Sequence, residues 1–232
     1  MDRRNFLHLG AMTGVASLLP AQQVQATADL IITHESLFYP YDIVVTGGRA
    51  DFMAWRVNYE RIRLLAADDI AVIRYHMSLD LYCILDVLER KLDLKPTVTK
   101  NVIERLYEIP PISYGNLIEK VKTAVDIPLI RVSTGDPARI VSKVGLAWGG
   151  LGLFVNIAHM QALIDMGCEV IIAGETDNYA IRFAKEAGLD IIETSHEVSE
   201  NFGIEEFIGT LRRDLPGANS MFYENKMPYK II

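Results

Sequence analysis

The sequence predicts an α/β fold built from two related halves with mainly parallel sheets. Short apolar runs rich in isoleucine and valine alternate along the chain with longer stretches in which apolar residues recur every three or four positions. The first pattern is typical of strands buried on both faces, and the second is typical of amphipathic helices. Strands and helices that alternate in this way favour a sheet of parallel strands joined by helices.

Four elements are expected before residue 107. Residues 29–34 (DLIITH) and 70–76 (IAVIRYH) are apolar and rich in β-branched side chains, so we expect strands there. Residues 52–69 and 79–94 are expected to form helices, because their apolar side chains recur at three and four positions. The order βαβα therefore describes residues 29–106, the first half.

A proline-rich stretch separates this half from the next. Residues 107–115 (YEIPPISYG) are expected to form a linker, because adjacent prolines disfavour both helix and central strand. The second half then covers residues 116–232. Helices are expected there at 116–125, 154–167, 178–188 and 205–215, and strands at 127–133, 140–149, 168–174 and 189–195.

Composition excludes several classes of function. The chain has 232 residues, of which 50% are hydrophobic, and its formal net charge is -7. An acidic chain of this kind is not expected to bind nucleic acid, because such proteins usually present a basic face. Cys83 and Cys168 both lie in apolar periodic segments, so neither a disulfide framework nor a cysteine zinc site is expected. No apolar run approaches the roughly 18 residues of a membrane span, so no membrane partner is expected.

The N-terminal segment, residues 1–28, has two interpretations. Arg3 and Arg4 are followed by a short apolar stretch, which resembles a twin-arginine export signal. Alternatively, Val15, Leu18 and Leu19 lie on one face of an ordinary N-terminal helix. We expect a cytoplasmic protein, with export by the twin-arginine route as the alternative.

Histidine and carboxylate side chains follow three of the expected strands. They are His34 and Glu35, His76 and Asp80, and His196 and Glu200. Because the carboxyl ends of parallel strands meet at one edge of a sheet, we expect these side chains to converge on a cleft there. His196 and Glu200 are four positions apart, so a helix that begins after the strand would place both on one face.

A metal ion would explain this cluster. Imidazoles and carboxylates are costly to dehydrate unless a positive charge holds them together. Mixed nitrogen and oxygen ligands suit zinc, manganese or iron, and the number of groups is enough for two ions. The alternative is that each pair is a surface ion pair or a helix cap. The glycine-rich run at 148–152 lacks the lysine of a phosphate-binding loop and is expected to be a strand-to-helix turn.

Four segments, taken in order, resemble a known family. They are ADLIITHES (28–36), AVIRYHMSLD (71–80), IIAGE (171–175) and IIETSHEVSE (191–200). They are similar to segments of the hexameric proteins with a dinuclear metal centre that are named after an Ngg-interacting factor and often labelled GTP cyclohydrolase 1 type 2 homologues. The resemblance runs from about Val24 to about Leu215.

The resemblance implies a specific set of ligands. His34, Asp80, His196 and Glu200 match the metal-binding positions of the family, with Glu200 as the ligand that bridges two divalent ions. Glu35 stands where most members have a second histidine. A carboxylate can replace imidazole as a ligand, so we retain Glu35 in the set and expect a changed metal preference.

Two functions follow from these residues and from the resemblance. The first is a metal-dependent hydrolase for a nucleotide or a related small molecule, with His76 or Glu175 as the proton carrier. The second is a non-catalytic metal-binding protein with a regulatory or scaffold role. In both cases the resemblance implies a ring-shaped homo-oligomer, either a hexamer or a trimer.

Overall fold

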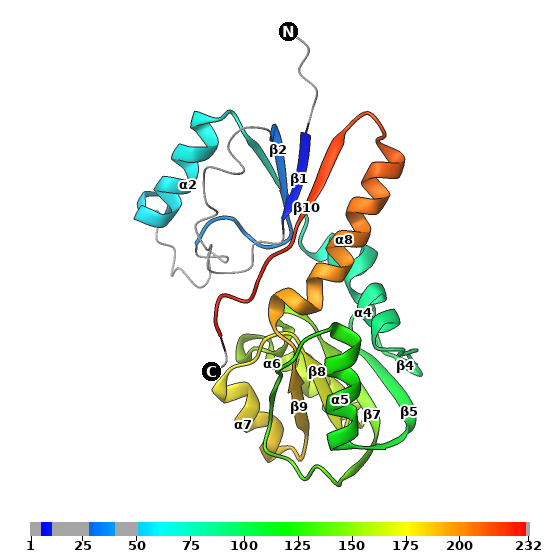
Figure 1. Ribbon diagram of the computed structural model, residues 1–232. Helices are drawn as coiled ribbons and strands as arrows, with labels where there is room; N and C mark the ends of the chain where they lie inside the picture. Colours follow the sequence, from blue (N-terminus) through cyan, green and yellow to red (C-terminus); the bar gives the residue numbers. More distant parts are fainter. Residues whose placement is uncertain (1–5, 11–27, 40–50, 231–232) are drawn as a thin grey trace. The chain divides into compact units, whose positions relative to one another are not determined.

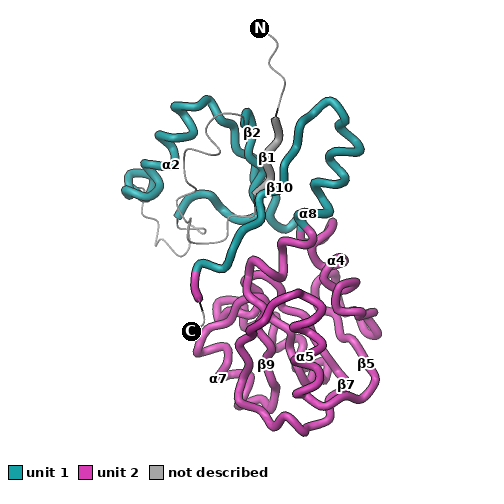
Figure 2. Tube along the Cα trace, in the orientation of Figure 1, with its two compact units in different colours: residues 1–79, 204–228 teal, residues 80–203, 229–232 magenta. Residues whose placement is uncertain are grey.

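The chain folds into two compact units. The computed structural model describes residues 6–10, 28–39 and 51–230. Unit 1 contains residues 1–79 and 204–228, and unit 2 contains residues 80–203 and 229–232 (Figure 2). Among the described residues, none of the helices has both the length and the apolar character needed to cross a bilayer.

Unit 1 is built on a four-stranded parallel sheet. Its strands, in spatial order, are β10 (Asn219–Tyr223), β1 (Phe6–Gly10), β2 (Leu30–Thr33) and β3 (Ala71–Arg74). All three pairs of neighbours are parallel, and β1 lies between β10 and β2. The helical turn η1 (Phe52–Ala54) and the helix α2 (Arg56–Ala67) connect β2 to β3 (Figure 1). The strands and the helix expected over residues 29–76 are confirmed.

The N-terminal segment is described only in part. Residues 6–10 form β1, an inner strand of the sheet. The paired arginines at 3 and 4, and the helix considered for residues 15–19, lie outside the described residues.

The helix expected at 79–94 has three consecutive parts. It begins with α3 (Met77–Leu79), continues as the π-helix η2 (Asp80–Ile84) and ends as α4 (Leu85–Lys91). The π-helical turn starts at Asp80, one of the predicted metal ligands. Such turns are rare in proteins and frequently occur at functional sites.

Unit 2 is built on a six-stranded sheet. Its strands, in spatial order, are β4 (Val98–Thr99), β5 (Arg105–Ser113), β7 (Ile140–Ala147), β8 (Val170–Ala173), β9 (Asp190–Glu193) and β6 (Arg131–Val132). The prediction of mainly parallel sheets holds for unit 1 and not for this sheet. β7, β8 and β9 are parallel, whereas β4, β5 and β6 join the sheet through antiparallel pairs.

The connections explain this mixed arrangement. β7 leads through the turns η3 (Gly149–Gly152) and η4 (Phe154–Asn156) and the helix α6 (Ile157–Asp165) to β8, and α7 (Asn178–Glu186) connects β8 to β9. A helical crossover returns the chain in the same direction, so these strands are parallel. A short loop between β4 and β5 reverses the chain, so that pair is antiparallel.

The stretch expected as a linker belongs to the sheet. Residues 105–113 form β5, and the next residue begins the helix α5 (Tyr114–Val125). Pro110 and Pro111 fall within a register shift between Glu108 and Ile112, where β5 does not follow the regular ladder with β7. Because proline lacks a backbone N–H, this irregularity lets the strand contain both prolines without losing a ladder hydrogen bond.

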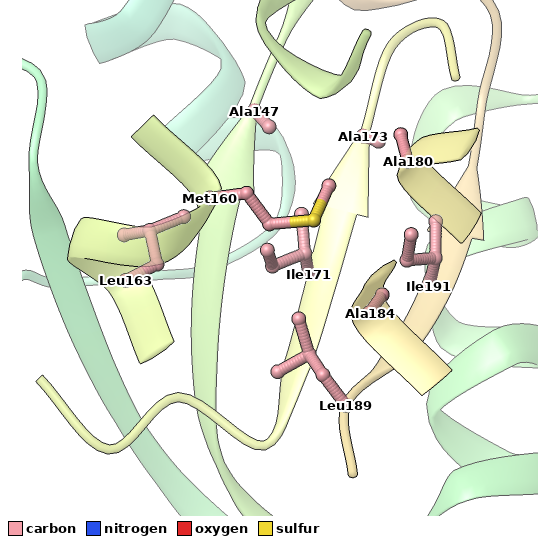
Figure 3. Close-up of a cluster of buried hydrophobic side chains, with 9 residues drawn as sticks. All are labelled: Ala147, Met160, Leu163, Ile171, Ala173, Ala180, Ala184, Leu189 and Ile191. Atoms are coloured by element: carbon pink, nitrogen blue, oxygen red, sulfur yellow. The ribbon is translucent and has the colours of Figure 1, made fainter. Parts of the chain in front are cut away.

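The core of unit 2 fixes the strands that lead to the site. Figure 3 shows a buried cluster in which Ile171 of β8 lies beside Met160 of α6, and Ile191 of β9 lies beside Ala180 and Ala184 of α7. Alanines from the strands and from α7 complete the cluster and allow these elements to approach closely: Ala147, Ala173, Ala180 and Ala184. Burial of apolar surface contributes about 25 cal/mol per Å². This packing stabilises the positions of β7, β8 and β9, whose carboxyl ends lead to the site.

Candidate metal centre

In unit 1, the ends of two neighbouring strands bring three of the predicted residues together. β2 and β3 are parallel neighbours, and His34 and Glu35 follow β2 while His76 follows β3. Nε2 of His76 lies 3.0 Å from Oε1 of Glu35, and Nδ1 of His34 lies 3.8 Å from the same oxygen. The three residues offer ligand atoms within 4.8 Å of one another.

This cluster is largely shielded from solvent. His34 and Glu35 are 2% and 8% exposed, whereas the His76 side chain is 45% exposed. The rings of His34 and His76 lie 4.7 Å apart. Arg74 donates from Nε to the carbonyl oxygen of His34, and its Nη2 lies 3.8 Å from Oε2 of Glu35. The guanidinium compensates part of the charge of the buried carboxylate.

In unit 2, the helix α8 (His196–Asp214) begins at a predicted ligand. His196 comes three residues after β9, and Glu200 follows one helical turn later. Nε2 of His196 lies 3.0 Å from Oε1 of Glu200, so the two side chains share one face of α8 as expected. Glu200 is only 1% exposed. A carboxylate buried to this degree requires a positively charged or hydrogen-bonding environment.

The turn after β7 packs against this pair. Gly149 has a φ of +51°, and a Cβ at this position would collide with Oε1 of Glu200. The backbone N–H of Gly149 donates to Oγ of Ser199 over 2.8 Å, and that hydroxyl donates to the carbonyl oxygen of His196 over 2.7 Å. The glycine-rich run at 148–152 is therefore the turn that was expected, and its function is to let the backbone approach Glu200 closely.

Asp80 is held by a tryptophan from the same turn. Nε1 of Trp148 donates to Oδ1 of Asp80 over 2.7 Å, and Trp148 is 2% exposed. Asp80 and Glu200 offer carboxylate oxygens within 4.8 Å of each other. Trp148 was not predicted as part of a site, although its place directly after a buried strand is the signal that could have identified it.

Glu175 contacts the other nitrogen of His196. It follows β8, and its Oε2 lies 3.0 Å from Nδ1 of His196. The side chain of Glu175 is 48% exposed, whereas that of His196 is 14% exposed. In unit 2, His196 thus lies between two carboxylates, with Glu175 at Nδ1 and Glu200 at Nε2.

The chemistry of these groups fits divalent metal ions. The buried donors are imidazole nitrogens and carboxylate oxygens, which suit zinc, manganese or iron. Neither cysteine belongs to a candidate ligand group of the described residues. His76 contacts Glu35, and Asp80 accepts a hydrogen bond from Trp148.

Comparison with known proteins identifies relatives over most of the chain. The model of the family described as Duf34/NIF3 (NGG1p interacting factor 3) matches residues 15–228. A protein of Haemophilus influenzae named "GTP cyclohydrolase 1 type 2 homolog" is 26% identical over 193 residues, which cover 78% of this chain and 70% of that protein.

Solved structures show the same fold. The Bacillus cereus protein related to NIF3 has a TM-score of 0.72 at 14% identity, covering 98% of this chain and 89% of that chain. The protein TTHA1606 from Thermus thermophilus has a TM-score of 0.67 at 17% identity, covering 97% of this chain and 85% of that chain. At these identities the likeness establishes the fold alone.

Proposed function

Because the chain belongs to the Duf34/NIF3 family, we propose that it is a dinuclear-metal-binding protein that acts as a metal-dependent hydrolase on a nucleotide or a related small molecule. Curated relatives carry the name "GTP cyclohydrolase 1 type 2 homolog". The observation that carries the proposal is the buried pair of His196 and Glu200, because Glu200 is 1% exposed and a bound cation would stabilise its buried carboxylate.

The proposal names five residues as metal ligands, each of them described within its own unit. They are His34 and Glu35 of unit 1, and Asp80, His196 and Glu200 of unit 2. Glu200 is the proposed bridge, because its carboxylate has two oxygens and lies within 4.8 Å of ligand atoms of both Asp80 and His196. Zinc, manganese and iron are the ions that this donor set favours.

The side chains around the ligands have separate roles. Two ions, when bound, lower the pKa of a water molecule and polarise the group that it attacks. His76 is the proposed proton carrier, because its ring lies 3.0 Å from the proposed ligand Glu35 and its side chain is 45% exposed, so it can exchange protons with solvent. Trp148 orients Asp80 through its indole N–H. Glu175 was the other proton carrier considered, and its contact with His196 favours a different role.

Activity should depend on both the metal and Asp80. We expect hydrolysis of at least one member of a panel of nucleotides and phosphoesters, loss of activity after chelation, and recovery when zinc, manganese or iron is added. Asp80→Ala should abolish activity, whereas Asp165→Ala, on the exposed end of α6, should leave it unchanged. Asp80→Asn keeps an oxygen that can accept from Trp148 but removes the charge. Loss of activity in this variant would therefore come from the missing charge and not from unfolding. Metal binding without hydrolysis across the panel would favour the regulatory or scaffold function instead.

We also propose that the chain forms a homo-oligomer, either a hexamer or a trimer. β3 is an edge strand of the unit 1 sheet, and Ile73 on it and Tyr75 directly after it are 39% and 40% exposed. Exposed apolar side chains on a strand edge favour contact with another chain. Light scattering on the purified protein would give the number of subunits, and a monomer would contradict this part of the proposal.

A further inference from the structure

We infer that Glu175 is a positioning residue that holds the ring of His196 so that Nε2 is directed at the metal and at Glu200. The inference rests on the proposed metal site and adds a residue whose role in it is distinct from ligation. Oε2 of Glu175 lies 3.0 Å from Nδ1 of His196, and Nε2 of the same ring lies 3.0 Å from Oε1 of Glu200.

Glu175 and Glu200 contact different nitrogens of the His196 ring. A histidine that binds a metal through one nitrogen usually donates its other ring N–H to a carboxylate, and in the proposed site Glu175 would accept from Nδ1 in this way. A neutral imidazole carries one N–H, and a hydrogen on Nδ1 therefore leaves the lone pair on Nε2. Nε2 is the nitrogen that lies beside Glu200, so the tautomer selected by Glu175 is the one that can bind an ion there.

The backbone places Glu175 without help from its side chain. The N–H of Glu175 donates to the carbonyl oxygen of Gly149 over 2.8 Å, and the N–H of Ser195 donates to the carbonyl oxygen of Gly174 over 2.9 Å. These bonds connect the segment after β8 to the turn after β7 and to the segment that precedes His196. Because they involve only main-chain atoms, substitution of the Glu175 side chain should leave the segment in place.

The alternative explanation is that Glu175 and His196 form an ordinary surface ion pair. In such a pair both side chains are exposed, whereas His196 is mostly buried. Exposed ion pairs contribute little to stability, because both side chains lose water and mobility for little gain. Here the His196 side chain is 14% exposed and is enclosed on its far side by Glu200, which is 1% exposed. Glu175 contacts Nδ1, the ring nitrogen that does not face Glu200.

Zinc affinity of the full chain tests this role directly. We would compare the wild type with Glu175→Ala, Glu175→Gln and the control Glu186→Gln, which lies at the opposite, exposed end of α7. Zinc would be removed and then titrated back in competition with a chromophoric chelator. Loss of such a supporting contact typically weakens metal binding by about 10–100-fold, which is the change expected for Glu175→Ala.

The two Glu175 variants should differ from each other. The amide oxygen of glutamine can accept the hydrogen bond from Nδ1 but carries no charge, so Glu175→Gln should bind zinc with an affinity between those of the wild type and Glu175→Ala. Glu186→Gln should match the wild type. Thermal unfolding of the metal-free proteins should be the same for all four chains, since the segment is held by its backbone.

Each other outcome has a definite meaning. Unchanged zinc affinity in Glu175→Ala would overturn the positioning role while leaving the metal site intact. Equal weakening in Glu175→Gln and Glu175→Ala would show that the hydrogen bond is not the link, and the inference would fail. A wild type that binds no zinc, manganese or iron would overturn both the proposed function and this inference. A metal-free Glu175→Ala with a lowered unfolding temperature would assign Glu175 to folding rather than to positioning.

Discussion

The indole N–H of Trp148 donates to Oδ1 of Asp80 over 2.7 Å, although the two residues are 68 positions apart in the chain. Trp148→Phe removes this donor and should destabilise unit 2 by about 1–3 kcal/mol, because Asp80 loses a partner in a partly buried place. Chemical denaturation would measure the change. A double-mutant cycle with Asp80→Ala isolates the contact from the loss of ring volume, and additive effects would show that the hydrogen bond contributes nothing.

The position of Gly149 predicts a difference between two glycine substitutions. Gly149 and Gly188 both have positive φ, at +51° and +76°, so alanine at either site has to adopt a strained backbone. At Gly188 nothing lies within 4 Å of the added Cβ, whereas at Gly149 the Cβ meets Glu200. Gly188→Ala should therefore cost about 1 kcal/mol of stability through strain alone and leave zinc affinity unchanged.

Gly149→Ala should lower both stability and zinc affinity, because the added methyl group displaces the carboxylate of Glu200. Thermal unfolding and zinc titration of the two variants, measured side by side, give the comparison. If both variants bound zinc like the wild type, Glu200 would not be a ligand.

The carboxylate of Glu35 leads us to expect that the metal site prefers manganese or magnesium over zinc. Oxygen donors favour manganese or magnesium over zinc relative to imidazole, so Glu35→His should raise zinc affinity at one site and leave the other nearly unchanged. Glu60→His makes the same substitution on α2 of unit 1, where Glu60 pairs with Arg63, and should have no effect. Metal titration of the three chains would check this. Equal zinc stoichiometry and affinity before and after Glu35→His would reassign Glu35 to a partner of His76 and Arg74.

The burial of His159 leads us to expect that the folded protein loses stability in mild acid. Burial lowers the pKa of His159, which is 6% exposed and lies 3.0 Å from the carbonyl oxygen of Leu146 through Nε2. The unfolded chain therefore takes up a proton at a higher pH than the folded chain does. Stability from this residue is complete above its ordinary pKa of about 6.5 and is lost as the pH falls below that value.

Replacing His159 should remove this part of the pH dependence. His159→Gln retains a donor for the carbonyl oxygen of Leu146 and does not titrate, so its free energy of unfolding should fall less than that of the wild type between neutral and mildly acid pH. Denaturant unfolding of both chains across this range measures the difference. Parallel curves for the two chains would show that His159 is not the source.

Local patterns predicted much of this structure, and contacts over long distances in the chain account for the rest. β2, α2, β3 and α6 follow from apolar periodicity, and β2 and α6 bury apolar side chains as that pattern indicates. β3 and α2 were found by the same pattern although β3 has no buried side chain and the buried residue of α2 is Asn58. The pairing of His196 with Glu200 follows from a spacing of four within one helix. The sequence could not show that Glu175 meets His196, since that contact depends on β8 and β9 lying side by side.

β5 shows why the adjacent prolines led to the prediction of a linker at a place where the chain forms a strand. Two adjacent prolines usually exclude a strand that has neighbours on both sides, yet β5 pairs with β4 and with β7. The register shift that accommodates the prolines is visible only when the partner strand is known. The boundaries of the two units lie after Leu79 and after Gly203. They do not fall at the proline-rich stretch where a linker was predicted.

Because β1 lies between β10 and β2, the N-terminal segment is needed to complete the unit 1 sheet. β1 pairs with β10 over residues 6–10 and with β2 over residues 7–10, and it begins soon after the paired arginines. Cleavage of the chain between β1 and β2 would take this strand away. β10 and β2 would then become two facing edges with unpaired backbone donors and acceptors, which is a place where a strand of another chain can insert. Loss of the N-terminal segment would thus open the unit 1 sheet to strand exchange with another chain.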